Sequence, residues 1–425
     1  MLQSPYVEKA LAQHFRVGDS GKWKVDLEKD IDSIVSSAAG RAMSNRPNLV
    51  IKSKLDKSGK KIFFAGDIET DLILRATYRC LSKQCGIRLP SREDIVNGIV
   101  EATSEACPYR VTKCDIKSFY ESLDAEPIVR NLLIDTRTDS NLKAVLRQIY
   151  SDPAVAKSVA PRGLAISAIF AEIALRDFDR LVRKTYGVHR YFRYADDIIV
   201  FSLPEVEVLP VIESELKKLN LQLNEKTEVS LVRAVGKLTS SDPLPISKYT
   251  YLGYEISAHE KVSSFTSRQF DISISETKLT KRKTRLFLAL HAFMNDGNTK
   301  LLINRLNYLS TNQSVYKTSH TRGAKRQKIR TGIHYNYPHC GHYPASKKGR
   351  IQQDHNAHEL IAIDVVLKNA LWGPQSEFST RFASLPTHLQ DELRRISFAQ
   401  GFKKKLMKRF TRQRVSQICK VWGHE

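Results

Sequence analysis

The stretch HRYFRYADDIIVFS, residues 189–202, decides the fold. Two short β-prone runs, 189–194 and 198–202, flank Ala195, Asp196 and Asp197, and this spacing predicts a hairpin whose turn carries two adjacent carboxylates. Like charges so close together repel one another unless a cation neutralises them. The alternative is a solvated Asp-Asp turn, because aspartate is a good turn residue.

A third acid could complete a metal site with this pair. YRVTKCDI (109–116) predicts a β-strand that ends at an acid, and Asp115 would lie beside the Asp-Asp pair if the two strands pair. Three converging carboxylates form the hard-oxygen site that Mg²⁺ prefers. Two such ions can activate a 3′-hydroxyl and stabilise a leaving pyrophosphate in an in-line displacement.

Strands and helices alternate around this hairpin, and the pattern becomes helical and basic from about residue 265. A β-hairpin is expected over 51–66 around Ser58-Gly59, and helices are expected over 71–81, 125–134, 140–150, 164–186 (as one long helix) and about 205–219. The pattern predicts an α+β fold followed by an all-α region. We expect N-terminal helices and fingers at 1–108, a palm at 109–262, a basic helical thumb at 263–345 and a C-terminal helical region at 346–425.

The positive charge is concentrated in two stretches. The 425 residues carry a formal net charge of +23, residues 281–350 hold 15 basic and 1 acidic side chains, and residues 394–425 hold 10 and 1. The rest of the chain is neutral. Such a surface favours a polyanion as partner, because each neutralised phosphate releases counterions. A solvated basic face or a membrane-surface patch is the alternative.

Other features bound the class of protein. With 41% hydrophobic residues the chain is long enough for a sizeable core and for two or three domains. No window approaches 18 uninterrupted apolar residues, and the N-terminus lacks the plan of a secretory signal, so we expect a cytoplasmic protein without a membrane span. Six scattered cysteines fit free thiols in a reducing compartment.

Histidines and one cysteine gather in a loop-like segment, HYNYPHCGHYP (334–344). Their spacing does not match a zinc finger, so incidental loop histidines are favoured over a zinc site. Asp354, His355 and His358 could mimic a nuclease site, although the start of a polar helix explains them as well.

Six motifs in order resemble the reverse transcriptase family. They are IKSKLDKSGKK (51–61), CDIKSFYESLD (114–124), PRGLAIS (161–167), YADD (194–197), LNLQLNEKTE (219–228) and YLGYEIS (251–257). They are similar to the fingers hairpin, the first palm motif, the Pro-Gln-Gly motif, the Tyr-x-Asp-Asp box, the Lys-Thr motif and the primer-grip hairpin. The resemblance covers about half the chain and implies a right-hand polymerase with fingers and palm, followed by an α-helical basic thumb and C-terminal region.

The resemblance assigns roles to the matching positions. Asp115, Asp196 and Asp197, with the backbone carbonyl of Ile116, would hold two Mg²⁺ ions, for which Mn²⁺ can substitute. The positions that would bind the incoming dNTP are Tyr120 as steric gate, Arg162, Gly163, Lys54, Lys61 and Lys226. Tyr194, Leu252 and Gly253 would support the primer and template. A half-buried aromatic for Tyr120, a solvated side chain for Lys226 and core packing for Tyr194 are the alternatives.

One departure from the family pattern concerns Arg162, which stands where many members have Gln. A guanidinium can reach a triphosphate but cannot accept a hydrogen bond. We therefore expect fidelity or nucleotide preference to differ from the viral enzymes.

Within the family, the chain resembles the bacterial, defence-associated "unknown group", its type 2 branch included. This implies an RNA-directed DNA polymerase that copies a structured non-coding RNA into cDNA for antiphage defence, with the RNA, the cDNA and dNTPs as partners. The basic residues expected to hold the RNA are Lys281, Arg282, Lys283, Arg285, Arg322, Lys325, Arg326, Lys328, Arg330, Lys347 and Lys348. An untemplated or protein-primed polymerase of the abortive-infection type, a retron or group II intron enzyme, and a binding scaffold on an inactive polymerase are the alternatives. The oligomeric state is left open.

Overall fold

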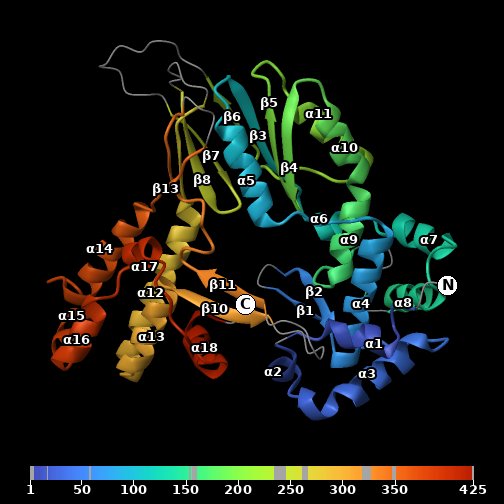
Figure 1. The fold of residues 1–425 in the computed structure, drawn as a ribbon, viewed down its shortest axis with the longest axis horizontal. Coiled ribbons are helices and arrows are strands. Elements are labelled where there is room, and N and C mark those ends of the chain that lie inside the picture. The colour runs from blue at the N-terminus through green and yellow to red at the C-terminus, as the bar shows by residue number, and fades with distance from the viewer. Residues whose placement is uncertain are drawn as a thin grey trace. The chain divides into compact units, whose positions relative to one another are not determined.

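The computed structural model describes residues 4–16, 18–56, 59–152, 155, 160–233, 246–260, 267–317, 327–346 and 351–423. It divides into two compact units (Figure 1). The first comprises Met1–Ile95, Arg110–Val229 and Lys317–Gln327, and the second comprises Val96–Tyr109, Ser230–Tyr316 and Lys328–Glu425. The expected fingers, palm and thumb boundaries stay a prediction.

The elements up to the end of the catalytic sheet are, in chain order, α1 (Glu8–Leu11), η1 (Ala12–His14), α2 (Asp19–Trp23), α3 (Leu27–Met43), β1 (Ile51–Leu55), β2 (Lys61–Ala65), α4 (Ile68–Gln84), α5 (Arg92–Thr103), β3 (Tyr109–Asp115), α6 (Phe119–Ser122), α7 (Glu126–Ile134), α8 (Ser140–Ser151), α9 (Ala165–Ala174), α10 (Arg176–Lys184), β4 (Val188–Tyr194), β5 (Asp197–Ser202), α11 (Leu209–Lys218) and β6 (Glu228–Val232). The expected hairpin at 51–66 is confirmed by the antiparallel pair β1–β2.

A four-stranded sheet in the order β4-β5-β3-β6 carries the hairpin of residues 189–202. The central strand β5 pairs antiparallel with both β3 and β4. Its residues Ile198–Phe201 are completely buried, which is why this segment is apolar throughout rather than alternating. Helix α10 packs on β4 (Figure 1). The sheet therefore fixes the end of β3 at Asp115 and the start of β5 at Asp197.

The helix expected over 164–186 is wrong in one respect, because the structure breaks it at Leu175 into α9 and α10. Helix α9 is apolar and half of its residues are buried in the core, whereas α10 is strongly amphipathic and covers β4. The three-and-four spacing of apolar residues runs across the break, so periodicity alone could not show it.

The second unit contains β7 (Ile246–Tyr251), β8 (Tyr254–His259), β9 (Phe270–Ile274), α12 (Glu276–Asp296), α13 (Thr299–Ser310), β10 (Asn312–Lys317), β11 (Gln327–Gly332), β12 (Gly341–Tyr343), β13 (Asp354–His355), α14 (Glu359–Trp372), α15 (Ser379–Ala383), α16 (Thr387–Arg394), α17 (Phe398–Lys403), α18 (Arg412–Cys419) and η2 (Lys420–Trp422). A five-stranded sheet runs β13-β12-β9-β8-β7, and its mapped pairings are antiparallel. Helices α12, α13, α14 and α17 pack on one another beside it (Figure 1).

The α+β fold class is confirmed, with more strand in the C-terminal third than the sequence predicts. Strand β12 extends the sheet through its pairing with β9, and the rings of Phe270 and Tyr343 stack there with centroids 4.4 Å apart. Strands β10 and β11 form a separate pair. A three-residue strand such as β12 is too short to show a period of two, so its partner rather than its own sequence makes it a strand.

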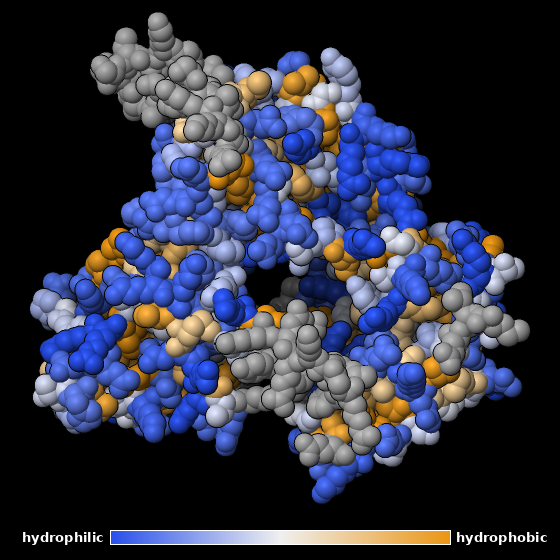
Figure 2. All heavy atoms as spheres, in the orientation of Figure 1, coloured by the Kyte–Doolittle hydropathy of each residue, from blue (hydrophilic) through white to orange (hydrophobic). Residues whose placement is uncertain are grey.

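On the face shown in Figure 2, hydrophilic residues predominate and hydrophobic residues appear as scattered patches. Among the residues that the structure describes, no helix has the length and apolar character that a membrane span requires. None of the six cysteines takes part in a disulfide.

Candidate active site

The sheet brings the three aspartates to one edge. Asp115, the last residue of β3, lies directly opposite Asp197, the first residue of β5. Side chains that face each other in an antiparallel pair start from Cβ atoms about 4.5–5.5 Å apart. Asp196 occupies the adjoining turn, and its carbonyl accepts a hydrogen bond of 3.2 Å from the N–H of Ile116. The expected proximity of the three acids is therefore present in the backbone.

The turn that carries Asp196 is tight and strained. Tyr194 pairs with Asp197, which leaves only Ala195 and Asp196 between the strands. Ala195 has a φ of 57°, as the first central residue of a type II′ hairpin turn requires. A non-glycine residue in this region costs about 1–2 kcal/mol. Something else in the structure must hold the turn in this conformation.

Arg193, on the strand before the turn, supplies part of that restraint. Its guanidinium donates to the Ala195 carbonyl at 3.0 Å, twice to Asp179 at 2.8 and 2.7 Å, and twice to Glu172 at 3.0 and 2.9 Å. These contacts use all five N–H donors of an arginine. The Arg193 side chain is 3% exposed, and the two carboxylates are 10% and 18% exposed. A buried ion cluster built on α9 and α10 thus reaches the backbone of the catalytic turn.

Asp115 is held from the other side by the segment 222–224. The Asn224 N–H donates to the Asp115 carbonyl at 2.7 Å, and its side-chain amide donates to an Asp115 carboxylate oxygen at 3.2 Å. The Lys117 N–H donates to the Gln222 carbonyl at 2.8 Å, so this segment pairs locally with the end of β3. Asn224 therefore orients one oxygen of Asp115.

The electrostatics of the edge are those of crowded acids. Burial raises the pKa of Asp196, and the charges of Asp115 and Glu121 raise it further, while Arg162 opposes them. Burial and the charge of Asp196 also raise the pKa of Tyr120. The acid cluster thus makes ionisation of Asp196 and of Tyr120 less favourable.

The residue types and their placement fit a divalent cation, although the carboxylates are not yet gathered around one point. Within the described ranges, no three His, Cys, Asp or Glu side chains stand close enough to hold an ion without rearrangement. Neighbouring carboxylates repel one another, so a shared cation would have to draw them together. Asp115, Asp196 and Asp197 would be its ligands, since oxygen donors suit Mg²⁺ and Mn²⁺. The Ile116 carbonyl stays a predicted ligand.

Arg162 and Gly163 lie against the fingers hairpin. The Arg162 side chain contacts Glu121 at 3.0 Å and Asp56 at 3.4 Å, and its carbonyl accepts from the Phe63 N–H at 2.7 Å. Gly163 has a φ of 100°, and a Cβ there would stand 2.4 Å from the Phe63 carbonyl oxygen. Close packing against β2 thus requires glycine at this position, whether or not the template also approaches it.

The fingers lysine that reaches this cluster is Lys60. Its ammonium donates to Ser118 Oγ at 3.3 Å and lies 3.8 Å from Glu121. The predicted phosphate ligands Lys54 and Lys61 are exposed, and the Lys61 ammonium lies 5.3 Å from the centre of the Phe63 ring. Both stay predictions. Ser58, expected in the turn, lies outside the described residues.

The other predicted positions are distributed as follows. Tyr120 is half-buried beside Phe119, Tyr194 is 42% exposed at the end of β4, and Lys226 is exposed. Leu252 and Gly253 belong to the second unit, where their φ values of 46° and 82° form the two-residue turn between β7 and β8. Two positive φ values in succession are those of a type I′ turn.

The basic residues expected to hold RNA fall in three groups. Lys281, Arg282, Lys283 and Arg285 lie on α12, where Lys283 pairs with Glu276 at 3.5 Å. On β11, Arg330 contacts the hydroxyl of Tyr335 at 3.1 Å, and of Lys328 only the backbone is described. Arg322, Lys325, Arg326, Lys347 and Lys348 lie outside the described residues.

The loop histidines do not form a zinc site in the described part of the chain. His334 is buried. The Asp271 carboxylate forms hydrogen bonds with two other histidines, His342 at 2.7 Å and His259 at 3.0 Å. That these histidines have no metal role stays a prediction.

Comparison with known proteins identifies the domain that carries the three aspartates. Residues 72–256 match the family model described as reverse transcriptase (RNA-dependent DNA polymerase). This stretch contains β3, β4, β5 and β7 and ends within β8. The chain therefore contains a reverse transcriptase domain, the domain of RNA-directed DNA polymerases.

Two solved structures show distant similarity to the chain. One is apo telomerase from Candida tropicalis truncated from its C-terminal domain, with 16% identity over 54% of this chain and 55% of that chain and a TM-score of 0.35. Another is telomerase from Candida albicans in complex with a TWJ fragment of telomeric RNA, with 15% identity, 59% and 50% coverage and a TM-score of 0.35. The chain spans about half the length of these telomerase chains. No curated protein matches it.

Three residues of the site were not predicted from the sequence: Asn224, Arg193 and Lys60. For Arg193 the sequence held a signal in Glu172 and Asp179. These two acids are seven residues apart in a segment with the apolar spacing of a helix, so they would lie on the same helix face and would need a cation as partner. An arginine within a β-prone run is the partner that such a pair needs. Asn224 gave no comparable signal, since nothing in its neighbourhood indicates contact with Asp115.

Proposed function

We propose that this chain is an RNA-directed DNA polymerase that copies a structured non-coding RNA into complementary DNA, and that it serves bacterial antiphage defence. The observation that carries the polymerase assignment is the pairing of Asp115 with Asp197 beside the Asp196 turn, within a domain that matches the reverse transcriptase family. The concentration of positive charge in residues 281–350 and 394–425 supports a folded RNA as partner. The resemblance to defence-associated bacterial enzymes supports the antiphage role.

In the proposed reaction the 3′-oxygen of the primer attacks the α-phosphorus of a dNTP. The bond from that phosphorus to the bridging oxygen breaks, pyrophosphate leaves with the electron pair, and the hydroxyl proton passes to water. Two Mg²⁺ or Mn²⁺ ions held by the three aspartates would activate the hydroxyl and neutralise the leaving pyrophosphate.

The remaining residues would position these reactants. Arg193 holds the backbone of the turn through the Ala195 carbonyl, and Asn224 orients the Asp115 carboxylate. Arg162 would contact the triphosphate by exchanging its contacts with Glu121 and Asp56 for phosphate oxygens.

Tyr120 would act as the steric gate against a ribose 2′-hydroxyl. Its half-buried ring lies near Asp196, whose charge raises its pKa. Lys54, Lys61 and Lys226 would hold phosphates as point charges, and Tyr194, Leu252 and Gly253 would support the primer strand.

Primer extension with the purified chain tests the polymerase assignment. We expect extension of a DNA primer on an RNA template with dNTPs, dependent on Mg²⁺ or Mn²⁺ and abolished by Asp197→Asn, and a product that is complementary to the template. A product unrelated to the template would support the untemplated alternative. No synthesis from a folded wild-type chain on any primed template would overturn the polymerase assignment.

The defence role needs its own experiment, in cells. Cells that express the wild-type chain together with the non-coding RNA recovered with it should resist phage, and cells that express Asp197→Asn with the same RNA should not. Equal plaque numbers with both proteins would refute the defence role while leaving the polymerase assignment intact.

A further inference from the structure

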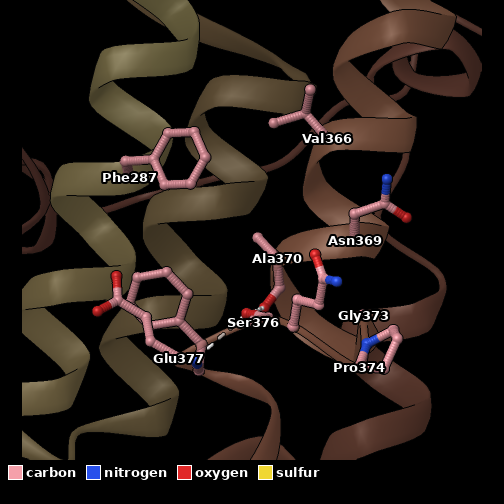
Figure 3. Close-up of a pocket in the computed structure, with 10 residues that line it drawn as sticks. Phe287, Val366, Asn369, Ala370, Gly373, Pro374, Ser376 and Glu377 are labelled. Atoms are coloured by element: carbon pink, nitrogen blue, oxygen red, sulfur yellow. Dashed lines mark hydrogen bonds between the residues drawn. The ribbon is translucent and has the colours of Figure 1, made fainter.

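Two cavities flank α12 in the second unit, and they differ in chemistry. One, of about 660 Å³, lies between α12 and α14 (Figure 3). Phe287 and Val366 stand at one end of it, Ser376 donates a hydrogen bond to the Ala370 carbonyl, and Glu377 is its charged side chain. Nothing in this lining selects a ligand. The other cavity, of about 300 Å³, is lined by four cations.

The four cations of the smaller cavity come from one face of α12. Lys278, Lys281, Arg282 and Arg285 are spaced by three, one and three residues, so they form a stripe on successive turns of the helix. Like charges at this spacing destabilise a helix. Glu276, the acid in the first turn of α12, pairs with Lys283, outside the stripe. Among the described residues that line the cavity there is no carboxylate.

Two of the cations are held in place by neutral groups. Arg282 donates to the Leu309 carbonyl, and burial with the charge of Arg285 lowers the pKa of Arg282 to about 10, so it stays protonated at neutral pH. The Arg285 guanidinium lies 5.7 Å from the centre of the Trp422 ring, and the Trp422 indole donates to the Arg285 carbonyl at 2.8 Å. Neither of these contacts cancels a positive charge, so both guanidinium groups are pre-positioned for an anion.

The charge of an anion decides how well it matches this cavity, whose volume of about 300 Å³ leaves room for several linked phosphate groups. An internal phosphodiester carries one negative charge, and a terminal phosphate monoester carries about 1.5 to 2 at neutral pH. Four converging cations match a polyphosphate better than either.

We infer that this cavity binds a polyphosphate group, and that the group is the 5′-triphosphate end of an RNA strand. The polyphosphate chemistry follows from the cavity alone, while the choice of an RNA end rests on the proposed function. An RNA that has not been processed after its synthesis begins with such a triphosphate. The cavity would thereby let the protein distinguish an unprocessed RNA from a cleaved one and fix the end of its RNA partner.

Binding of three RNAs that differ only at the 5′ end tests the inference. The full chain is titrated with one labelled single-stranded RNA that bears a 5′-triphosphate, a 5′-monophosphate or a 5′-hydroxyl, at constant ionic strength. We expect the triphosphate RNA to bind at least tenfold more tightly than the hydroxyl RNA. Equal affinity for all three would overturn the inference.

The test variant is the double substitution Lys278→Gln, Lys281→Gln, which removes two exposed lysines from the cavity. We expect its preference for the triphosphate end to fall below about threefold. The matched control, Lys300→Gln with Lys403→Gln, removes two exposed lysines of α13 and α17 that do not line the cavity. It should keep the full preference. A preference that survives in the test variant, or is lost equally in the control, would refute the assignment to this cavity.

Competition identifies the source of the polyphosphate. Free ATP, GTP and inorganic triphosphate should displace the triphosphate RNA only at much higher concentration than an unlabelled RNA of the same sequence and end. Displacement by free nucleotides at equal concentration would overturn the RNA-end assignment. A wild-type chain that shows the end preference but no DNA synthesis would refute the proposed function and leave the cavity assignment standing.

Discussion

Arg193→Lys tests whether the buried arginine positions the catalytic turn or only stabilises the fold. The arginine makes five hydrogen bonds to two carboxylates and the Ala195 carbonyl. A lysine keeps the charge, but its three donors sit on one nitrogen. It cannot reach both oxygens of two carboxylates and the Ala195 carbonyl at the same time. We therefore expect the bond to the turn to be lost first.

The magnitude follows from that bond. A hydrogen bond with one charged partner contributes about 1.5–3 kcal/mol, which exceeds or matches the strain of about 1–2 kcal/mol at Ala195, whose φ is 57°. Without the bond, the strain of about 1–2 kcal/mol alone governs the turn, and the population of the observed conformation falls by about 6- to 30-fold, at about 1.4 kcal/mol for each factor of ten. We expect kcat for primer extension to fall by that factor, with a much smaller change in KM for dNTPs.

The effect on folding is separated by a second variant and a control. Arg193→Met leaves Glu172 and Asp179 buried without a cation, which costs about 3–5 kcal/mol. This corresponds to a fall in Tm of roughly 6–20 °C for a unit of this size. The control is Arg190→Lys, because Arg190 is an exposed arginine of the same strand and should change neither kcat nor Tm.

Kinetics at a temperature where every variant is folded decide the question. A large loss of kcat in Arg193→Lys with at most a modest fall in Tm supports a positioning role. If Arg193→Lys lowers Tm but extends primers at the wild-type rate, Arg193 is structural only and the reasoning fails.

Three further predictions concern other parts of the chain. Gly163→Ala should lower Tm and activity far more than Gly59→Ala. Both glycines have a positive φ, but only at Gly163 would an added Cβ meet a backbone oxygen, at 2.4 Å. Equal losses of Tm in the two variants would contradict this packing. Asn224→Leu should lower kcat about tenfold with Tm changed by a few degrees, because it removes the amide donor to Asp115; wild-type kcat would show that Asn224 is dispensable. Burial and the charges of Lys405 and His355 lower the pKa of His334 to about 4. The unfolded chain therefore binds a proton at this histidine more readily than the folded chain does. The stability that is present above pH 6.5 is lost as the pH falls toward 4. The Tm of His334→Phe should therefore decline less steeply over that range than the Tm of the wild type or of the exposed-histidine control His388→Gln, and parallel curves would refute it.

The catalytic edge could be predicted from the sequence because its signals are local. Two β-prone runs around Ala195, Asp196 and Asp197 allow only a tight hairpin, and the strand that ends at Asp115 has one sensible partner. Strand pairing then brings the three acids together. The order of the six motifs added what local pattern could not, namely the family and its chemistry.

Residues that act across long sequence distances could not be predicted in the same way. Asn224 meets Asp115 only because segment 222–224 pairs with the end of β3, and no pattern in its own segment indicates this. The ammonium of Lys60, the residue just before β2, lies 3.8 Å from Glu121, and no pattern in the sequence distinguishes it from Lys54 or Lys61. The break at Leu175 was hidden by a spacing that continues across it.

The short strands of the second unit were missed for a related reason. Strands β12 and β13 have three and two residues, and they exist because β9 offers an edge for pairing. The basic composition of the region carries no information on strand pairing. The arrangement of the four cations on α12 was visible as a three-and-four spacing, whereas the cavity they line required the structure.

The most direct test of the central claim is to sequence the nucleic acids bound to the tagged protein in cells, with and without phage. The comparison is the Asp196→Ala, Asp197→Ala double variant. We predict that the wild type carries one dominant RNA together with its complementary DNA, and that the variant carries the RNA alone. If DNA is absent from both proteins, or is present but complements no bound RNA, the chain does not copy an RNA template and the account is wrong.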